Sequence, residues 1–475
     1  MGIVFWIFVA LYTYAILNTI VVLLLENRNP VKSMAWIVAL LFFPIGGWIL
    51  YLYFGKNYRR EKLISKKSIK SLNQPVYQLH YNQIDKNLLT PFNTGLIRLL
   101  YQNSGATAYK SNQITIFNRG KEAFDAIFRA IEEAKHHIHV EFYIVEPDEI
   151  GNRFFDLLMR KAREGLEVRF MFDDVGSWKL KKKHLKPLAE AGVRFHSFLP
   201  VKLPFLSQKV NYRNHRKIVI VDGITGFTGG LNIADRYFKG NHLGEWHDTL
   251  IRIDGMAVQG LQKVFLVDWF FVDRVLLTDE RYFVKQLPEN TTDHSLVQIV
   301  TSSPDSDWES IMQGFLHAIA AARQYVYIQT PYFLPTEAML SVIKTTALSG
   351  VDVRLLLPAV NDAPTTYAAS CSYVREIMEA GVKVYFYQKA FIHAKNIIVD
   401  DEFTSIGSTN VDSRSFEQNF EVNAFIYNTE TALKMKSYFL DLLKDAPRLT
   451  LEKWAKRPRK QKIKESFARL FSPLL

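Results

Sequence analysis

The sequence predicts an α/β protein: two duplicated α/β/α sandwich domains packed about a pseudo-two-fold axis, preceded by a two-helix transmembrane hairpin. Three observations lead to this prediction. Helix and strand patterns alternate over most of the 475 residues, which is typical of sheets covered by helices. A polar motif occurs twice, at His215 and at His393, 178 residues apart. Two long uncharged apolar runs stand near the start of the chain.

The two apolar runs are residues 3–25 and 34–54. Each meets the roughly 20 residues that a helix requires to cross ~30 Å of hydrocarbon. A signal peptide is the alternative for the first run. However, no basic segment precedes this run, and the second run follows after a short loop. We therefore expect a transmembrane helical hairpin over residues 1–58.

Basic residues dominate the segment that follows the second run, and the whole chain carries a net charge of +12. We expect residues 59–110 to form a basic juxtamembrane linker, and the positive-inside rule then places the rest of the chain on the cytoplasmic side. A chain of this charge suits nucleic acid or anionic lipid, and the two spans favour an anionic lipid bilayer. The single cysteine, Cys371, excludes an internal disulfide.

A first α/β domain is expected over residues 111–288. Residues 121–145 have the pattern of an amphipathic helix that runs into a strand, and the same order recurs in 152–174. A glycine, Gly165, ends the second of these helices, where a left-handed residue is favoured. A polar stretch that contains a proline, 287–294, marks the end of this domain.

The helix–strand pattern starts again in a second domain, expected over residues 289–450. Its segment "VIKTTALSGVDVRLLL" matches "LLMRKAREGLEVRFMF" of the first domain in the glycine, the Val-Arg pair and the apolar end. The chain then finishes in a basic tail, 451–475, in which apolar and aromatic residues are interleaved. This pattern favours an amphipathic helix at a membrane surface, and a disordered, solvated tail is the alternative.

In both domains a histidine and a lysine stand two positions apart before an apolar strand pattern. The pairs are His215 with Lys217 and His393 with Lys395. Residues two apart on a strand face the same side, at ~3.3 Å rise per residue. Each pair is therefore predicted to project together from the head of a buried strand.

Small residues and then an asparagine follow each pair, Asn232 in the first copy and Asn410 in the second. One histidine, lysine and asparagine make half of a phosphate site, and two facing halves complete it. Attack on a phosphodiester requires a nucleophile, a proton donor and positive charge around the non-bridging oxygens. Two imidazoles can divide the first two tasks, and the lysines and asparagines supply the third. No metal or cofactor is required.

The repeated motif, H-x-K-x4-D-x6-G-[GS]-x-N, resembles the signature of the phospholipase D superfamily. With the apolar hairpin, "FGKNYRR" after it and "FSPLL" at the end, the chain resembles bacterial cardiolipin synthases over nearly its whole length. The resemblance implies two phospholipase D-like domains, a place in the bacterial cell (inner) membrane and phosphatidyltransferase activity.

The resemblance also implies a covalent phosphohistidine intermediate. It favours His215 as the nucleophile and His393 as the general acid and base, although coupled histidines leave the two roles open. Family members carry a downstream acid that orients each histidine. We match Glu245 to His215 and Glu421 to His393, while "GEWHDT" also offers Asp248.

Three further residues complete the predicted site. The motif aspartates, Asp222 and Asp400, belong to the catalytic signature, but their position at the end of an apolar strand favours a role in ordering the turn. Ser408 adds a hydroxyl to the phosphate-binding set of the second half, where the first half has Gly230. The two half-sites are therefore expected to be unequal.

The resemblance implies that one phosphatidylglycerol donates its phosphatidyl group to another, giving cardiolipin and glycerol. A phospholipase D that uses water is the alternative within the superfamily. A membrane-tethered nuclease and a catalytically idle scaffold are alternatives from other classes. A nuclease would need neither the hairpin nor the amphipathic tail, so no nucleic acid partner is expected.

Overall fold

The structure is a computed structural model that describes residues 2–25, 30–51, 90–201, 211–283 and 295–475. The chain divides into two compact units: residues 1–63 with 201–211, and the rest. Most of the predicted basic linker and the predicted domain boundary at 287–294 lie outside the described residues.

The described part of the first unit is helical and apolar. Helix α1 (Gly2–Leu25) is long and apolar enough to cross a membrane, and within the described residues it is the one helix that is. The second predicted span is divided into α2 (Pro30–Phe42) and α3 (Pro44–Leu50), because Pro44 lacks the N–H that would continue the helix. Each piece alone is shorter than a membrane crossing.

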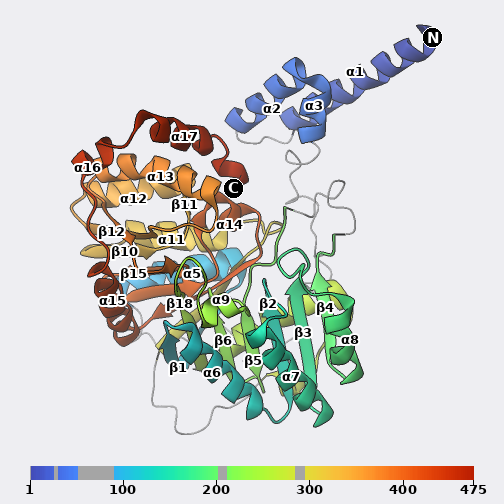
Figure 1. Cartoon of the computed structure of the whole chain (residues 1–475), viewed down its shortest axis with the longest axis vertical. Coiled ribbons are helices and arrows are strands. Elements are labelled where there is room, and N and C mark those ends of the chain that lie inside the picture. The colour runs from blue at the N-terminus through green and yellow to red at the C-terminus, as the bar shows by residue number, and fades with distance from the viewer. Residues whose placement is uncertain (1, 26–29, 52–89, 202–210, 284–294) are drawn as a thin grey trace. The chain divides into compact units, whose positions relative to one another are not determined.

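The second unit is built on one sheet of fourteen described strands (Figure 1). Seven of them come from the first half of the unit, in the sheet order β1 (Ala108–Phe117), β8 (Leu250–Gly255), β6 (Thr225–Gly229), β5 (Ile218–Val221), β2 (His137–Phe142), β3 (Glu167–Asp173) and β4 (Arg194–Phe198). The other seven continue from the far side of β1, in the order β9 (Ser295–Ser302), β18 (Glu421–Tyr427), β16 (Phe403–Gly407), β15 (Asn396–Val399), β10 (Tyr325–Gln329), β12 (Asp352–Pro358) and β13 (Lys383–Tyr387).

This strand order confirms the predicted duplication. It is the same on both sides of the β1–β9 pair, which is antiparallel and places Ala108 opposite Gln298. In each half the strands next to the junction are antiparallel, and the three outermost, β2–β3–β4 and β10–β12–β13, are parallel. The two halves are therefore copies of one α/β unit, joined edge to edge in a single sheet.

Helices cover both faces of the sheet, as the pattern of β2 shows. Ile138 and Val140 belong to the apolar core under α6 and α7, whereas His139 points to the other face and stacks on Phe265 of α10. The corresponding helices in the two halves are α6 (Gly120–Glu132) and α11 (Ser310–Ala320), α7 (Glu149–Arg163) and α12 (Glu337–Leu348), α8 (Lys182–Glu190) and α13 (Pro364–Glu379), and α10 (Val258–Asp273) and α15 (Thr429–Leu443).

One helix lies where the sequence predicted a linker. Helix α5 (Pro91–Ser104) begins at a capping box on Thr90 and buries Leu96 and Leu100 in the core of the second half. The chain thus enters the second half first, and only then supplies β1 to the first half. The expectation that the folded domain starts near residue 111 rested on the basic composition of the preceding segment. Composition alone does not reveal the four buried positions of this helix.

The motif aspartates order the turns that follow β5 and β15, as the sequence analysis favoured. Asp222 follows β5 in the left-handed region at φ 54°, and its carboxylate accepts hydrogen bonds from the backbone N–H groups of residues 135–137, at 2.8–3.0 Å. Asp400 does the same at φ 50°, for the backbone N–H groups of residues 323–325. Each aspartate thereby ties the strand of its motif to the start of the neighbouring strand, β2 or β10.

We expect Asp222→Ala to weaken the fold more than the chemistry. Three backbone donors lose a charged acceptor and alanine is disfavoured at positive φ, so the cost is about 2–4 kcal/mol. Thermal denaturation of the full chain in detergent would then show a midpoint lowered by roughly 5 °C. Asp125→Ala, which removes an exposed carboxylate of α6, is the matched control. An unchanged midpoint in Asp222→Ala would contradict the assigned role.

Candidate active site

The two His-x-Lys segments are extended but do not lie on the strands that follow them, contrary to the sequence prediction. Residues 214–217 precede β5, and Asn214 forms an isolated parallel bridge with Phe420 of the other half. In the second copy, β14 (Phe391–Ile392) pairs in parallel with β7 (Trp246–His247) of the first half. Each histidine therefore follows a short pairing with the opposite half of the unit.

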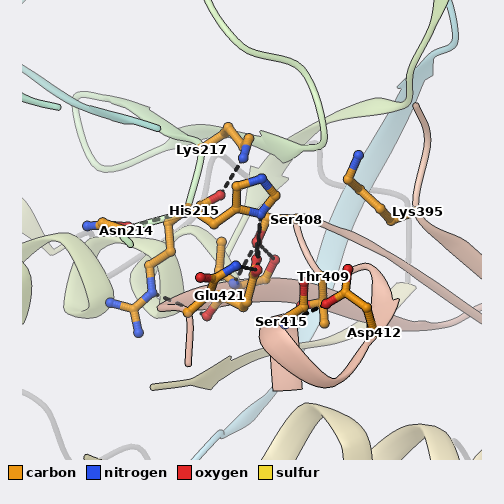
Figure 2. Close-up of polar contacts among 12 residues, drawn as sticks. Asn214, His215, Lys217, Lys395, Ser408, Thr409, Asp412, Ser415 and Glu421 are labelled. Atoms are coloured by element: carbon orange, nitrogen blue, oxygen red, sulfur yellow. Dashed lines mark hydrogen bonds and ion pairs between the residues drawn. The ribbon is translucent and has the colours of Figure 1, made fainter. Parts of the chain in front are cut away.

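These pairings bring each histidine next to a carboxylate of the other half. The His215 backbone N–H donates to the carbonyl oxygen of Phe420 at 2.9 Å, and its ring Nδ1 lies 3.0 Å from the Glu421 carboxylate. Figure 2 shows the His215 ring with Glu421 on one side and Lys217 on the other. Glu421 thus orients His215, not His393 as the sequence analysis assigned.

The partner of His393 is Asp248. The His393 backbone N–H donates to the carbonyl oxygen of His247 at 2.7 Å, and Nδ1 lies 2.6 Å from the Asp248 carboxylate. Glu245, which the sequence analysis matched to a histidine, is exposed instead. The correction therefore replaces Glu245 with Asp248 and exchanges the acids between the two histidines.

The sheet register shows why Asp248 is the counterpart of Glu421. Gly229 of β6 pairs with Leu250, and Gly407 of β16 pairs with Asn423. Each acid stands two positions before the paired residue. Asp248 nevertheless comes 33 residues after its motif histidine and Glu421 only 28, because the first half has five more residues in between. Counting from the strand, rather than from the histidine, would have found it.

The two motif lysines lie buried behind the histidines. Lys217 Nζ donates to the carbonyl oxygen of His215 at 2.5 Å, and Lys395 Nζ donates to that of His393 and lies 2.9 Å from its Nδ1. Burial lowers the pKa of Lys217 to about 7 and that of Lys395 to about 8. A bound phosphate anion would favour the charged form of both ammonium groups and so be stabilised by them.

Both histidines line one cavity of about 690 Å³. Tyr143 and Tyr237 set their rings against His215 and His393, with centroids 4.9 and 5.5 Å apart. Three arginines line the cavity, Arg213, Arg236 and Arg414, together with two aspartates, Asp362 and Asp412. Arg213 pairs with Asp173 and Arg236 with Glu146. Two imidazoles, one from each half, are thereby presented to a single space that suits an anion.

The two predicted phosphate-binding asparagines line this cavity, but differ in their contacts. Asn232 is held in place, because its Oδ1 accepts from the Ile144 N–H at 3.1 Å and its Nδ2 donates to Tyr237 at 2.7 Å. The Oδ1 of Asn410 is buried and has no hydrogen-bond partner among the described residues. The motif aspartates, at the ends of β5 and β15, do not line the cavity and bind backbone N–H groups, which corrects their place in the predicted catalytic set. The motif lysines do not line the cavity either, but each contacts its motif histidine.

Ser408 lies behind the site and does not line the cavity in which a phosphate would bind. Its hydroxyl is buried, donates to the Glu421 carboxylate and accepts from the Val422 N–H. At the equivalent position, a Cβ on Gly230 would stand 2.1 Å from an oxygen of Asp248. The predicted inequality of the halves is therefore present, but it acts on the orienting carboxylates and not on substrate contacts.

The two carboxylates also differ electrostatically. Glu421 is buried, which opposes ionisation, but His215, Lys217 and Ser408 together hold its pKa below the usual value. For Asp248 burial outweighs the lysines and raises the pKa to about 7. Burial also lowers the pKa of His215 to about 4, against the pull of Glu421, and that of His393 well below its usual value. Both rings are thus neutral bases before an anion binds.

A neutral imidazole whose Nδ1 donates to a carboxylate turns the lone pair of Nε2 away from that carboxylate. For His215 this leaves one ring nitrogen for the cavity and fixes the tautomer of the ring. For His393 the same Nδ1 also lies 2.9 Å from Lys395 Nζ, so its tautomer depends on the protonation of Asp248 and Lys395. The arrangement suits nucleophilic attack by one ring and proton transfer by the other at a single phosphorus atom.

Comparison with known families agrees with this geometry. The family described as "Cardiolipin synthase, PLD-like domain" matches residues 127–269 and 315–443 of the chain. The chain belongs to this family. A second match, to the family described as "Phospholipase_D-nuclease N-terminal", covers residues 5–56. The two segments of the first match fall in the two halves of the sheet.

Individual members of the family are similar over nearly the whole chain. "Cardiolipin synthase 2" of Bacillus anthracis is 42% identical over 461 residues, which cover 96% of this chain and 89% of that protein. "Major cardiolipin synthase ClsA" of Bacillus subtilis is 40% identical and covers 97% of both chains.

A solved structure supports the fold. The phosphatidylserine synthase of Haemophilus influenzae superposes with a TM-score of 0.63 at 15% identity, and the match covers 82% of this chain and all of the other. At this identity the likeness concerns the fold alone.

We expect removal of the orienting charges to reduce turnover of a phospholipid substrate without loss of the fold. Glu421→Gln and Asp248→Asn should each lower kcat by about 10²–10⁴-fold, because the histidine loses its tautomer and its electrostatic support. Glu245→Gln, the exposed control, should stay within about twofold. Steady-state kinetics in mixed micelles measure this. Equal losses in Glu245→Gln would restore the assignment made from the sequence.

A pH profile tests the contact between Ser408 and Glu421. Ser408→Ala removes a donor that helps to hold the pKa of Glu421 low, so Glu421 should take up a proton at higher pH. Because the ionised carboxylate orients His215, the acidic limb of kcat/KM should move to higher pH. Ser405→Ala, a buried serine whose hydroxyl accepts from Asn423, is the control and should leave this limb in place.

Proposed function

We propose that this chain is a cardiolipin synthase that transfers a phosphatidyl group from one phosphatidylglycerol to another and releases glycerol. The observation that carries the proposal is the convergence of two carboxylate-held imidazoles, from two halves, on one cavity lined by arginines. Full-length similarity to proteins named cardiolipin synthase supports the choice of substrate.

In the first step, Nε2 of His215 attacks the phosphorus of the donor lipid. A P–N bond forms and the bond between phosphorus and the headgroup glycerol oxygen breaks. His393, protonated when the anionic lipid is bound, gives its proton to that oxygen, and free glycerol leaves. Lys217 and Lys395 stabilise the charge on the non-bridging oxygens.

In the second step, the now neutral His393 takes the proton from a headgroup hydroxyl of the second phosphatidylglycerol. The oxygen attacks the phosphorus, the P–N bond breaks and His215 is restored as a neutral base. One phosphodiester is exchanged for another, so the reaction requires no further co-reactant. Water in place of the lipid hydroxyl would give phosphatidic acid instead.

The inequality of the two carboxylates supports His215 as the nucleophile. Its partner Glu421 is the carboxylate with the lowered pKa, so it remains an anion that favours the cationic phosphohistidine. The pKa of Asp248 near 7 makes the His393 pair the one that holds or releases a proton near neutral pH.

The location is also part of this proposal. We place α1 and the α2–α3 segment as two membrane spans, 3–25 and 34–54, with the catalytic halves on the cytoplasmic side of the bacterial inner membrane. Support comes from the apolar length of α1, the family match over residues 5–56 and the basic residues that follow in the sequence. Anionic phospholipid, and not nucleic acid, is the expected partner.

Product analysis tests the reaction. The purified full chain, incubated with phosphatidylglycerol in mixed micelles, should yield cardiolipin and glycerol in equal amounts. Phosphatidic acid as the main product would instead identify a hydrolase.

Single substitutions test the shared site. His215→Ala and His393→Ala should each abolish transfer, by at least about 10⁴-fold, because both rings act on one phosphorus atom. If the roles are as assigned, a phosphatidyl adduct should accumulate on His215 of a slowed variant such as His393→Ala, and mass spectrometry of the peptides locates it. Full activity of either variant would contradict a shared site, and an adduct on His393 would reverse the roles.

A further inference from the structure

Helix α17 (Arg459–Arg469) has its apolar side turned outward. Its exposed large side chains are Ile463, Phe467, Leu470 and, just beyond it, Phe471, with exposed fractions of 69, 63, 74 and 40%. Their spacing of i, i+4, i+7 and i+8 places them in one stripe. A stripe of this kind normally faces a protein core, whereas here nothing among the described residues of the second unit covers it.

The opposite side of α17 carries the contacts that hold it to the protein. Glu465 is buried and pairs with Arg457, Ala468 belongs to the core of the second half, and Arg469 lies 3.1 Å from Glu376 of α13. Figure 1 shows α17 on the outer side of α13, away from the sheet. Polar and small residues therefore bind the helix to the second half, and its apolar stripe faces outward.

Charge indicates what covers the stripe. Residues 456–475 contain seven basic side chains and one acid, and that acid, Glu465, faces inward. Lys460 and Lys464 flank the stripe and are exposed. A second copy of the chain, related by two-fold symmetry, would bring like charges together, whereas an anionic bilayer offers acyl chains to the stripe and phosphates to the flanking lysines.

The helix is also connected to the catalytic cavity. After Phe471 the chain forms a short 3-10 helix (Ser472–Leu474) that contacts α14 (Ser413–Glu417), the helix that carries Arg414 and Ser415 into the cavity lining. Leu475 itself lines the same cavity as His215 and His393. Four residues thus lead from the exposed stripe to the wall of the active site.

We infer that α17 lies in the headgroup region of an anionic bilayer, with Ile463, Phe467, Leu470 and Phe471 among the acyl chains. Residues 472–475 then hold the opening of the cavity against the lipid surface. The contact orients the catalytic halves. The inference rests on the proposed function for the identity of the lipid, but its test does not.

The experiment places an environment-sensitive fluorophore on the stripe of the full chain in vesicles. Leu470→Cys carries the label. Leu348→Cys is the matched control, because Leu348 is about as exposed, at 72%. It is the last residue of α12, at the edge of the sheet where β12 begins. The cavity lies at the opposite edge. The native Cys371 is buried, and the unsubstituted chain serves as the labelling blank.

In vesicles of phosphatidylglycerol and phosphatidylcholine that contain a quencher on the acyl chain, we expect strong quenching at Leu470 and little at Leu348. The difference should shrink in pure phosphatidylcholine or at high salt, because the flanking lysines lose their partners. Equal quenching at both sites, no quenching at Leu470, or indifference to both lipid charge and salt would each overturn the inference.

A functional arm separates this inference from the reaction. The double variant Ile463→Ser/Phe467→Ser should lose roughly tenfold in rate on vesicles and keep its rate in detergent micelles, which offer no bilayer surface to orient the catalytic halves. An unaltered rate on vesicles contradicts the role of α17 even if cardiolipin is formed. A quenched label on a chain that forms no cardiolipin instead refutes the proposed function and leaves the docking surface in place.

Discussion

The structure depends on one reciprocal contact: each active-site histidine is held by a carboxylate that the other half supplies. His215 meets Glu421 and His393 meets Asp248, and in both cases the backbone of the histidine is tied to the residue just before that acid. Neither half therefore contains a complete catalytic pair, although each is a full α/β unit. The duplication is functional only when the two copies are joined.

The single sheet is what keeps this exchange in register. Because β1 and β9 pair directly, the two copies share one hydrogen-bonded framework rather than an interface of side chains. Such a framework resists the small shifts of an ångström that would separate a ring from its carboxylate. The motif aspartates extend it, since Asp222 and Asp400 tie the ends of β5 and β15 to the starts of β2 and β10.

The residues that are local in sequence could be predicted, and those set by tertiary register could not. The histidines, lysines and asparagines follow from a motif of fixed spacing that is repeated. Asp248 does not follow from this motif, because its position depends on which residues of β6 and β8 face each other. The first half also has five more residues between the motif histidine and the acid, so counting from the histidine favoured Glu245. The exchange of acids between halves and the packing of α5 likewise come from contacts that spacing does not encode. The break before Pro44 is different, because the proline that causes it is visible in the sequence.

The two halves differ at one small side chain behind the site. Gly230 leaves room for the Asp248 carboxylate, while Ser408 fills the same place in the other half and donates to Glu421. One carboxylate thus gains a donor and the other does not, and their pKa values move in opposite directions, to about 7 for Asp248 and downward for Glu421. Two equal half-sites would hold their protons alike. The proposed reaction, with one carboxylate that stays an anion and one pair that carries a proton, is served by environments that separate the two. The charge of His215 contributes most to lowering the pKa of Glu421, and the Ser408 hydroxyl adds to it.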